Sequence, residues 1–220
     1  MQVTHDSWRL DHPWSTLYSY MINRPWLVKP VVRVVFGADP GALFETTAII
    51  GELPEGTSVL DVPCGNGIAV RAIRPGQGLR YVAADIAPTM LERTRHTARS
   101  CGVSDQVSTH EADVGALPFT DGEFDVCVSF TGLHCFPDPR AAVEEIARVV
   151  RPGGLVSLSW VRADSGIHRA TLAIGRGMGL TGHSARAGEV RGWLTECGFT
   201  PVHQATSGAF AYLTAVRLRN

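Results

Sequence analysis

Short apolar runs alternate with amphipathic segments through the middle of the chain. Residues 89–102 have the apolar spacing of a helix, which follows Pro88 and ends at Gly102. Residues 138–154 have the same spacing and are stopped by Pro152 and a glycine pair. Runs of strand length lie at 57–62, 78–85, 106–113, 124–130 and 155–161. This alternation predicts a mostly parallel sheet with helices on both faces.

The two ends of the chain have different patterns. Residues 14–51 are predicted to form helices interrupted by three prolines, ahead of the first strand. Residues 187–199 predict a helix closed at Gly198, and the strands 200–206 and 209–218 then flank Ser207 and Gly208 as an antiparallel hairpin. We therefore expect a doubly wound α/β fold with a seven-stranded sheet, formed by residues 52–220 as one compact unit. Residues 1–51 are expected to form a helical cap.

Composition narrows the classes of partner. The 220 residues are 45% hydrophobic and have a formal net charge of -1. This charge disfavours electrostatic binding to the phosphate backbone of a nucleic acid. Five scattered cysteines without a C-x-x-C pair speak against a disulfide framework and a zinc site. The chain has no signal-like start and no apolar run long enough to span a membrane. We expect a cytoplasmic protein with a small-molecule partner, as a monomer or homodimer.

The stretch "VLDVPCGNGIAV" carries the first candidate chemistry. It places Gly65 and Gly67 directly after a strand, where open parallel sheets bind ligands. A dinucleotide fingerprint would need Gly or Ala at position 70, but Val70 stands there. Asp61 is poorly placed for a pyrophosphate and suits a cationic group. The loop therefore favours a ligand without phosphates.

Two further aspartates follow neighbouring strands. Asp85 ends the second strand, 20 residues beyond Gly65, at the distance where a carboxylate meets ribose hydroxyls in such folds. Asp113 ends the third strand in the same way. Together with Asp61 they indicate a nucleoside pocket. The alternative is that each aspartate caps the helix or turn that follows it.

The chain resembles the class I S-adenosylmethionine-dependent methyltransferases, in the group that includes the quinone-biosynthesis methyltransferases. The resemblance rests on "VLDVPCGNG", "VAADIAPTMLERTR", "EADVGALPFTDGEFDVCVSFTGLHCFPDP" and "EIARVVRPGGLVSLSW". It implies a Rossmann-like fold and S-adenosylmethionine as the cofactor, with S-adenosylhomocysteine as the product. The chain departs from the family at Ala69, where a third glycine is common, and at Pro63.

The resemblance also implies roles for individual residues. The methionine moiety would be held by Asp61, Pro63, Cys64, Gly65, Asn66 and Gly67, and contacted by Ser129, Phe130 and Thr131 near the methyl group. The ribose would bind Asp85, with Ile86 and Met90 against the adenosine. The adenine would bind Asp113 and Val114.

The remaining candidates concern the methyl acceptor. His134 is the best-placed histidine and has two interpretations, a base or polar wall near the methyl group, or a residue that shapes the cofactor site. We expect Trp160, His168 and His183 to line the acceptor pocket, and Tyr20 to contact the cofactor from a lid. No carboxylate cluster for a metal is apparent, so no metal is expected.

Three functions remain open. The first is methyl transfer to oxygen or carbon of a small, apolar or aromatic metabolite. The second is non-catalytic binding of S-adenosylmethionine or S-adenosylhomocysteine. The third, a nicotinamide-dependent oxidoreductase, is disfavoured by Val70 and Asp61.

Overall fold

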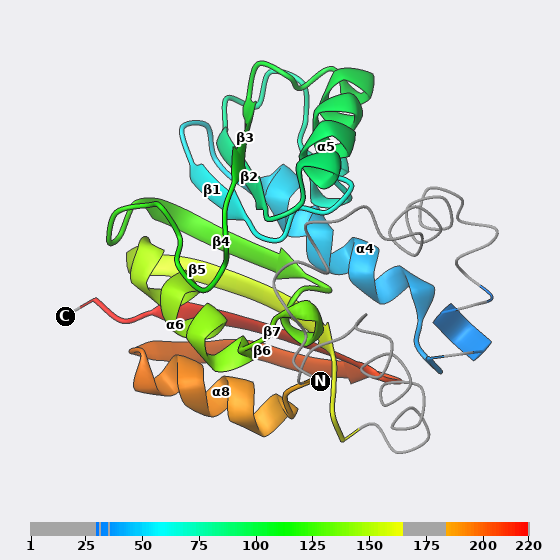
Figure 1. Ribbon diagram of the computed structural model, residues 1–220, viewed down its shortest axis with the longest axis vertical. Coiled ribbons are helices and arrows are strands. Elements are labelled where there is room, and N and C mark those ends of the chain that lie inside the picture. Colours follow the sequence, from blue (N-terminus) through cyan, green and yellow to red (C-terminus); the bar gives the residue numbers. More distant parts are fainter. Residues whose placement is uncertain (1–29, 31, 35, 165–183, 220) are drawn as a thin grey trace.

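The computed structural model describes residues 30, 32–34, 36–164 and 184–219. Seven strands form one sheet in the order β3-β2-β1-β4-β5-β7-β6 (Figure 1). The first five strands pair in parallel, and β7 is antiparallel to both β5 and β6. Their bounds are β1 Ser58–Asp61, β2 Arg80–Asp85, β3 Val107–Glu111, β4 Phe124–Phe130, β5 Val150–Val161, β6 Phe199–Ser207 and β7 Phe210–Arg217. The predicted doubly wound fold with a C-terminal antiparallel hairpin is confirmed.

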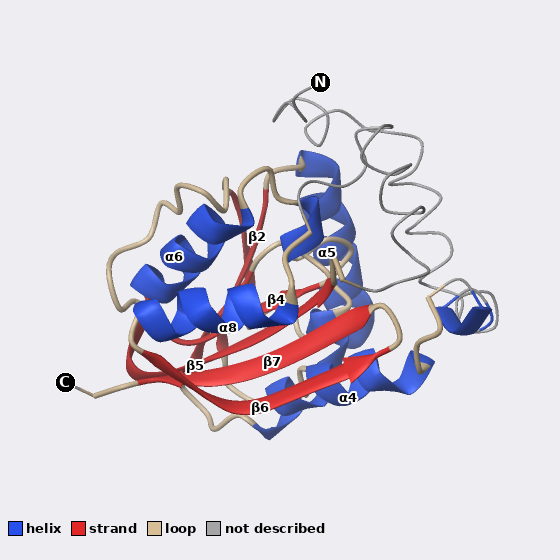
Figure 2. Cartoon of the chain, turned by 90° about the horizontal axis from the view of Figure 1, so that it is seen from below, coloured by secondary structure: helices blue, strands red, loops and turns tan. Residues whose placement is uncertain are grey.

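Helices cover both faces of this sheet (Figure 2). One face packs against α6 and α8, and the other against α5 with the shorter elements near α4. Alternate strand residues face opposite ways, so Leu60 lies in the first core and its neighbour Val59 in the second. The helices are α4 Pro40–Ala48, α5 Pro88–Cys101, α6 Pro139–Val149 and α8 Ala187–Glu196, with 3₁₀ turns η1 Ile49–Glu52, η2 Ala69–Ala72 and η3 Leu133–Cys135.

Local chemistry explains where the two central helices begin and end. A proline occupies the first turn of both α5 and α6, where the missing N–H is not needed. Asp138 caps α6 by accepting from the backbone amides of Arg140 and Ala141. Gly102 ends α5 in the left-handed conformation, with φ of 69°.

One strand differs from the sequence expectation. The strand predicted from residue 155 starts at Val150, so Pro152 and the glycine pair lie inside β5. Pairing with β4 shifts register between Phe124 and Val126, and such irregularities admit proline into a strand. The crossover between β1 and β2 contains the short 3₁₀ turn η2, because Pro75, Gly76 and Gly78 follow it closely.

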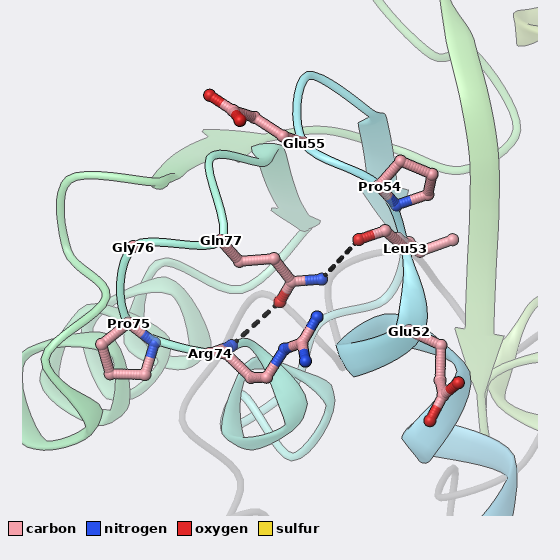
Figure 3. Close-up of a pocket in the computed structure, with 8 residues that line it drawn as sticks. All are labelled: Glu52, Leu53, Pro54, Glu55, Arg74, Pro75, Gly76 and Gln77. Carbon is pink, nitrogen blue, oxygen red and sulfur yellow. Dashed lines mark hydrogen bonds between the residues drawn. The ribbon is translucent and has the colours of Figure 1, made fainter.

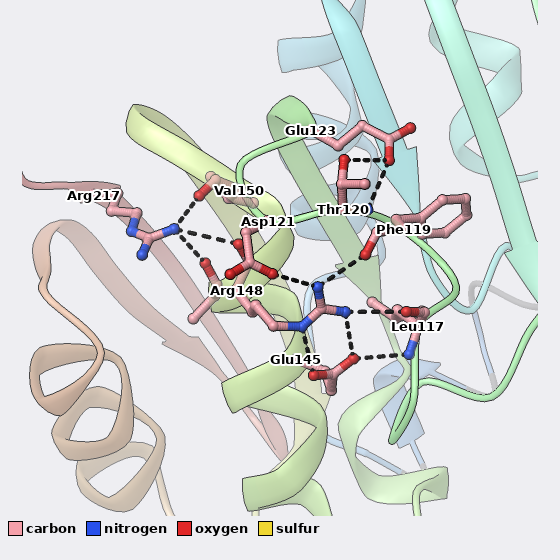
Figure 4. A network of polar contacts seen from close by, with 10 residues as sticks. Leu117, Phe119, Thr120, Asp121, Glu123, Glu145, Arg148, Val150 and Arg217 are labelled. Atoms are coloured by element: carbon pink, nitrogen blue, oxygen red, sulfur yellow. Dashed lines mark hydrogen bonds and ion pairs between the residues drawn. The ribbon is translucent and has the colours of Figure 1, made fainter.

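Arg148 organises the connection between β3 and β4 (Figure 4). Its guanidinium donates to the carbonyls of Leu117 and Phe119 and forms ion pairs with Asp121 and Glu145. Glu145 in turn accepts from the backbone amide of Leu117. This network anchors on α6 the loop that starts at Asp113 and Val114.

A hollow lies at the amino ends of β1 and β2, away from the glycine loop (Figure 3). Gln77 lines this hollow. Its Nε2 donates to the carbonyls of Ile50 and Leu53, and its Oε1 accepts from the backbone amide of Arg74. Gln77 therefore connects the two loops that precede β1 and β2.

Within the described ranges, no helix is long and apolar enough to cross a bilayer.

Candidate cofactor and active site

The glycine loop lies where the carboxyl ends of β1, β2 and β4 meet. It leaves β1 after Asp61 and is bonded to β2, since the amide of Cys64 donates to the carbonyl of Ala84 at 2.9 Å. The amide of Gly65 donates to Asp85 Oδ2, also at 2.9 Å. Gly65 and Gly67 have φ of 53° and 76°, a region that favours glycine. A Cβ at Gly65 would meet no atom within 4 Å, so that side of the loop is open for a ligand.

Helix α5 supports the loop from the other side. The hydroxyl of Thr94 donates to the carbonyl of Gly65, and that of Thr97 donates to the carbonyl of Asn66, both at 2.9 Å. A Cβ at Gly67 would lie 3.2 Å from atoms of both threonines. The loop therefore presents its backbone to the ligand side while its carbonyls at these two residues are satisfied by α5.

Asp61 is a carboxyl group in an apolar environment. It is 1% exposed and accepts a 2.9 Å hydrogen bond from the hydroxyl of Tyr81, which is itself fully buried in β2. Burial raises the pKa of Asp61 to about 8, the hydrogen bond from Tyr81 lowers it, and the charge of Asp85 raises it. At neutral pH such a carboxyl is mostly protonated, and an approaching cation would favour its ionised form.

Asp85 is held by two backbone amides. One oxygen accepts from Ala87 at 3.0 Å and the other from Gly65, and burial still raises the pKa of this carboxyl to about 6. Asp85 thus stabilises the turn ahead of α5, although it does not cap the helix, whose N-cap is Ala87. Each carboxylate oxygen also has a second lone pair for a ligand hydroxyl. Ile86, just ahead of α5, and Met90, in its first turn, are both partly exposed.

Asp113 lies two residues beyond the end of β3. Its carboxylate accepts from the amide of Gly115 at 2.9 Å. This bond stabilises the turn that follows Asp113, as expected if the aspartate only caps a turn. Val114 is 7% exposed and packs in the core between the sheet and α6. The adenine roles of both residues stay predictions.

The turn after β4 is tightly packed against the glycine loop. A Cβ at Gly132 would lie 2.4 Å from Pro63 Cδ and 2.6 Å from Ser129 Oγ. Thr131 has φ of 55°, unusual for a β-branched residue, and its amide donates to the hydroxyl of Ser159 in β5 at 3.0 Å. Ser129 Oγ is buried and has no hydrogen-bond partner in the described part of the chain.

His134 and Trp160 lie beside this turn. His134 is partly buried in η3, and its Nδ1 accepts from the backbone amide of Val161 in β5 at 3.4 Å. Burial lowers the pKa of His134 to about 4. Trp160 is 0% exposed, and its indole N–H donates to the carbonyl of Ala185, so it lies within the core. Its predicted contact with substrate stays a prediction.

Three predicted site residues lie outside the described ranges, namely Tyr20, His168 and His183, as does most of the predicted cap at 1–51. Among the described residues, no group of three or more His, Cys, Asp or Glu side chains is arranged to hold a metal ion. The structure also adds four residues that support the candidate site, which are Tyr81, Thr94, Thr97 and Ser159.

A family model and several known proteins match part of this chain. Residues 60–158 match the family model described as a methyltransferase domain. An otherwise uncharacterised protein of Mycobacterium tuberculosis is 39% identical over 107 residues, which cover 48% of this chain and 38% of that protein. The 27-O-demethylrifamycin SV methyltransferase of Amycolatopsis mediterranei is 33% identical over 115 residues, which cover 51% and 42%. The chain thus spans about two fifths of the length of these relatives.

Solved structures share the fold at low sequence identity. The YcgJ protein of Bacillus subtilis superposes with a TM-score of 0.69 at 15% identity, over 80% of this chain and 100% of that chain. A chain from the complex that contains the Haloferax volcanii Trm112 methyltransferase activator gives a TM-score of 0.73 at 19% identity, over 98% of each chain. These structures and the seven-stranded sheet agree in fold. The match of residues 60–158 identifies that part of the chain as a methyltransferase domain of the class I S-adenosylmethionine-dependent family.

Proposed function

We propose that the chain transfers a methyl group from S-adenosylmethionine to oxygen or carbon of a small, apolar or aromatic metabolite. The observation that carries the proposal is the glycine loop, which follows the buried Asp61 directly and is fixed between α5 and the buried carboxyl group of Asp85. The rifamycin methyltransferase among the relatives acts, by its name, on an oxygen of a small molecule, which supports the same substrate class.

The residues present fit this cofactor. The raised pKa of Asp61 marks a carboxyl that gains most from an approaching cation, such as the ammonium of a methionine moiety. Asp85 retains acceptor capacity for the two ribose hydroxyls after its bonds to Gly65 and Ala87. The open side of Gly65 lets backbone approach the ligand closely.

When bound, S-adenosylmethionine supplies a methyl group on a positively charged sulfur, so the protein has mainly to align the acceptor and exclude water. In the proposed mechanism, Asp61 and the glycine loop fix the methionine end and Asp85 fixes the ribose. Ser129, Phe130 and Thr131 then border the methyl group from the end of β4. The predicted cap at 1–51 would complete the pocket, and it remains part of the proposal.

Calorimetric titration with S-adenosylhomocysteine, combined with a radiolabelled methyl-transfer assay, tests the proposal. We expect S-adenosylhomocysteine to bind at micromolar concentration in calorimetry, and radiolabelled methyl to pass from S-adenosylmethionine to one or more members of a panel of phenols, quinols and polyketides. Cofactor binding without transfer to any acceptor would favour the non-catalytic binder. Binding of NADH in place of S-adenosylhomocysteine would contradict both.

The protonation state of Asp61 leads to a separate prediction. With a pKa of about 8 in the free protein, Asp61 is mostly protonated at pH 7, and a bound ammonium should ionise it. Calorimetry in buffers of different ionisation enthalpy should then show release of a fraction of a proton, at most one, for each S-adenosylhomocysteine bound at pH 7. The release should fade as the pH rises above 8.

The matched variants are Asp61→Asn and Asp105→Asn. Asp61→Asn should abolish the proton release and weaken binding, because it removes the carboxyl that ionises. Asp105 is exposed ahead of β3, and its replacement should leave the release unchanged. Equal proton release by the wild type and Asp61→Asn would exclude Asp61 as the contact of the ammonium.

A further inference from the structure

The end of β5 fixes the turn that follows β4 through two hydrogen bonds. Ser159 accepts from the amide of Thr131, and two residues later the amide of Val161 donates to His134 Nδ1. On its other side the same turn packs at Gly132 against Pro63 of the glycine loop. His134 therefore has a defined ring orientation in η3, directly after the turn that is proposed to border the methyl group.

The bond to Val161 also defines the tautomer of His134. A backbone N–H can only donate, so Nδ1 must carry the lone pair, and the single proton of the neutral ring then lies on Nε2. A second proton on Nδ1 would point at the N–H of Val161. This agrees with the low pKa that burial gives to the ring.

This arrangement makes His134 a poor base for the reaction. Nδ1 is engaged with Val161, and Nε2 has no lone pair unless the ring changes tautomer and breaks that bond. Nε2 does offer an N–H donor, on the opposite side of the ring from Val161. A donor of this kind suits an acceptor that already carries negative charge.

We propose that His134 donates from Nε2 to an ionised oxygen of the methyl acceptor, and that the substrate class is therefore an oxygen acid that reaches the site as its anion, such as a carboxylate or an acidic phenolate. The inference rests on the proposed function and deepens it. The chemistry balances without a base: the anionic oxygen forms the bond to the methyl carbon, the sulfur–methyl bond breaks, and its electron pair returns to the cationic sulfur. The products are a neutral ester or ether and S-adenosylhomocysteine.

The tautomer can be measured without any substrate. Long-range ¹H–¹⁵N spectra of the full chain labelled with ¹⁵N-histidine, assigned with His134→Gln, should show His134 protonated on Nε2 and unprotonated on Nδ1 at pH 7. An Nδ1–H tautomer, or a doubly protonated ring at that pH, would overturn the inference.

Two substitutions at His134 separate its two nitrogens. Asparagine places an acceptor near Nδ1 and lacks the Nε2 donor, whereas glutamine places an amide N–H near Nε2. We expect His134→Asn to weaken benzoate binding to the S-adenosylhomocysteine complex by about tenfold or more, because a hydrogen bond to a charged group is lost, and His134→Gln to change it less than about threefold. The exposed residue His203 provides the control, and His203→Gln should bind as the wild type.

The outcomes of this experiment are distinct from those that decide the proposed function. Equal weakening in both His134 variants, or no binding of benzoate or 4-nitrophenolate to the wild-type complex, would overturn the anionic-acceptor inference. Failure of S-adenosylhomocysteine itself to bind, or absence of methyl transfer to every acceptor tested, would count against the proposed function. Transfer to neutral alcohols with benzoate excluded would retain methyltransferase activity and reject the inference.

Discussion

Alanine in place of Asp85 is expected to weaken S-adenosylhomocysteine binding by at least about a hundredfold, since each hydrogen bond to a charged group contributes about 1.5–3 kcal/mol and two ribose hydroxyls are proposed to donate to this carboxylate. The same change removes the acceptor of the Gly65 amide, so the loop also loses a point of attachment to β2. Isothermal titration calorimetry at pH 8, where Asp85 is ionised, measures the loss directly.

A ligand analogue distinguishes the ribose contact from loop support. The 2′,3′-dideoxy analogue of S-adenosylhomocysteine lacks both hydroxyls, so wild-type protein should bind it far more weakly than the parent compound, and Asp85→Ala should bind the two about equally. If the variant still prefers the parent compound as strongly as the wild type does, Asp85 acts only on the loop. Asp105→Ala, at an exposed aspartate, should behave as the wild type does with both ligands.

The second large effect is expected from Gly132→Ala. The new methyl group would lie 2.4 Å from Pro63 Cδ, a ring atom that cannot rotate away, and 2.6 Å from Ser129 Oγ. Overpacking of this kind lowers the free energy of unfolding by about 1–3 kcal/mol. Because Pro63 belongs to the glycine loop, relief of the clash should displace that loop and reduce cofactor affinity as well. Thermal unfolding with and without S-adenosylhomocysteine measures both effects.

The matched control for this variant is Gly192→Ala in the middle of α8. A Cβ at Gly192 would meet no atom within 4 Å, and alanine stabilises a helix interior by about 0.5–1 kcal/mol relative to glycine. The melting temperature should therefore rise slightly, with cofactor affinity unchanged. A Gly132→Ala protein as stable as the wild type, with normal affinity, would show that the turn and the loop adapt without strain.

The sequence predicts the strands well because their apolar runs are separated by clear breaks. The sequence also indicates that Asp61 and Asp85 lie at the ends of strands beside the glycine loop. A carboxylate that ends an apolar run can be recognised without knowledge of the tertiary structure. The start of β5 at Val150 was missed because Pro152 and the glycine pair normally mark a loop, whereas here an irregular pairing with β4 admits them.

The supporting residues could not be assigned from the sequence because their partners are distant in it. Tyr81 meets Asp61 only because β2 pairs with β1 in a register that puts both on one face of the sheet. Thr94 and Thr97 are three residues apart on α5, which hints at a shared face but does not indicate that this face contacts the glycine loop. The role of Ser159 likewise depends on the unusual conformation of Thr131.

The position of β7 between β5 and β6 affects the order in which the site can be completed during synthesis. Strand β5, which holds Thr131 and His134 in place, has β4 on one side and β7, from residues 210–217, on the other. On the ribosome the elements that bear Asp61, Asp85 and the glycine loop emerge well before β7. The proposed cofactor-binding part, with Asp61, Asp85 and the glycine loop, is thus available to form first. The part around Thr131 and His134 borders an unpaired strand edge, exposed to pairing with other chains, until β7 follows.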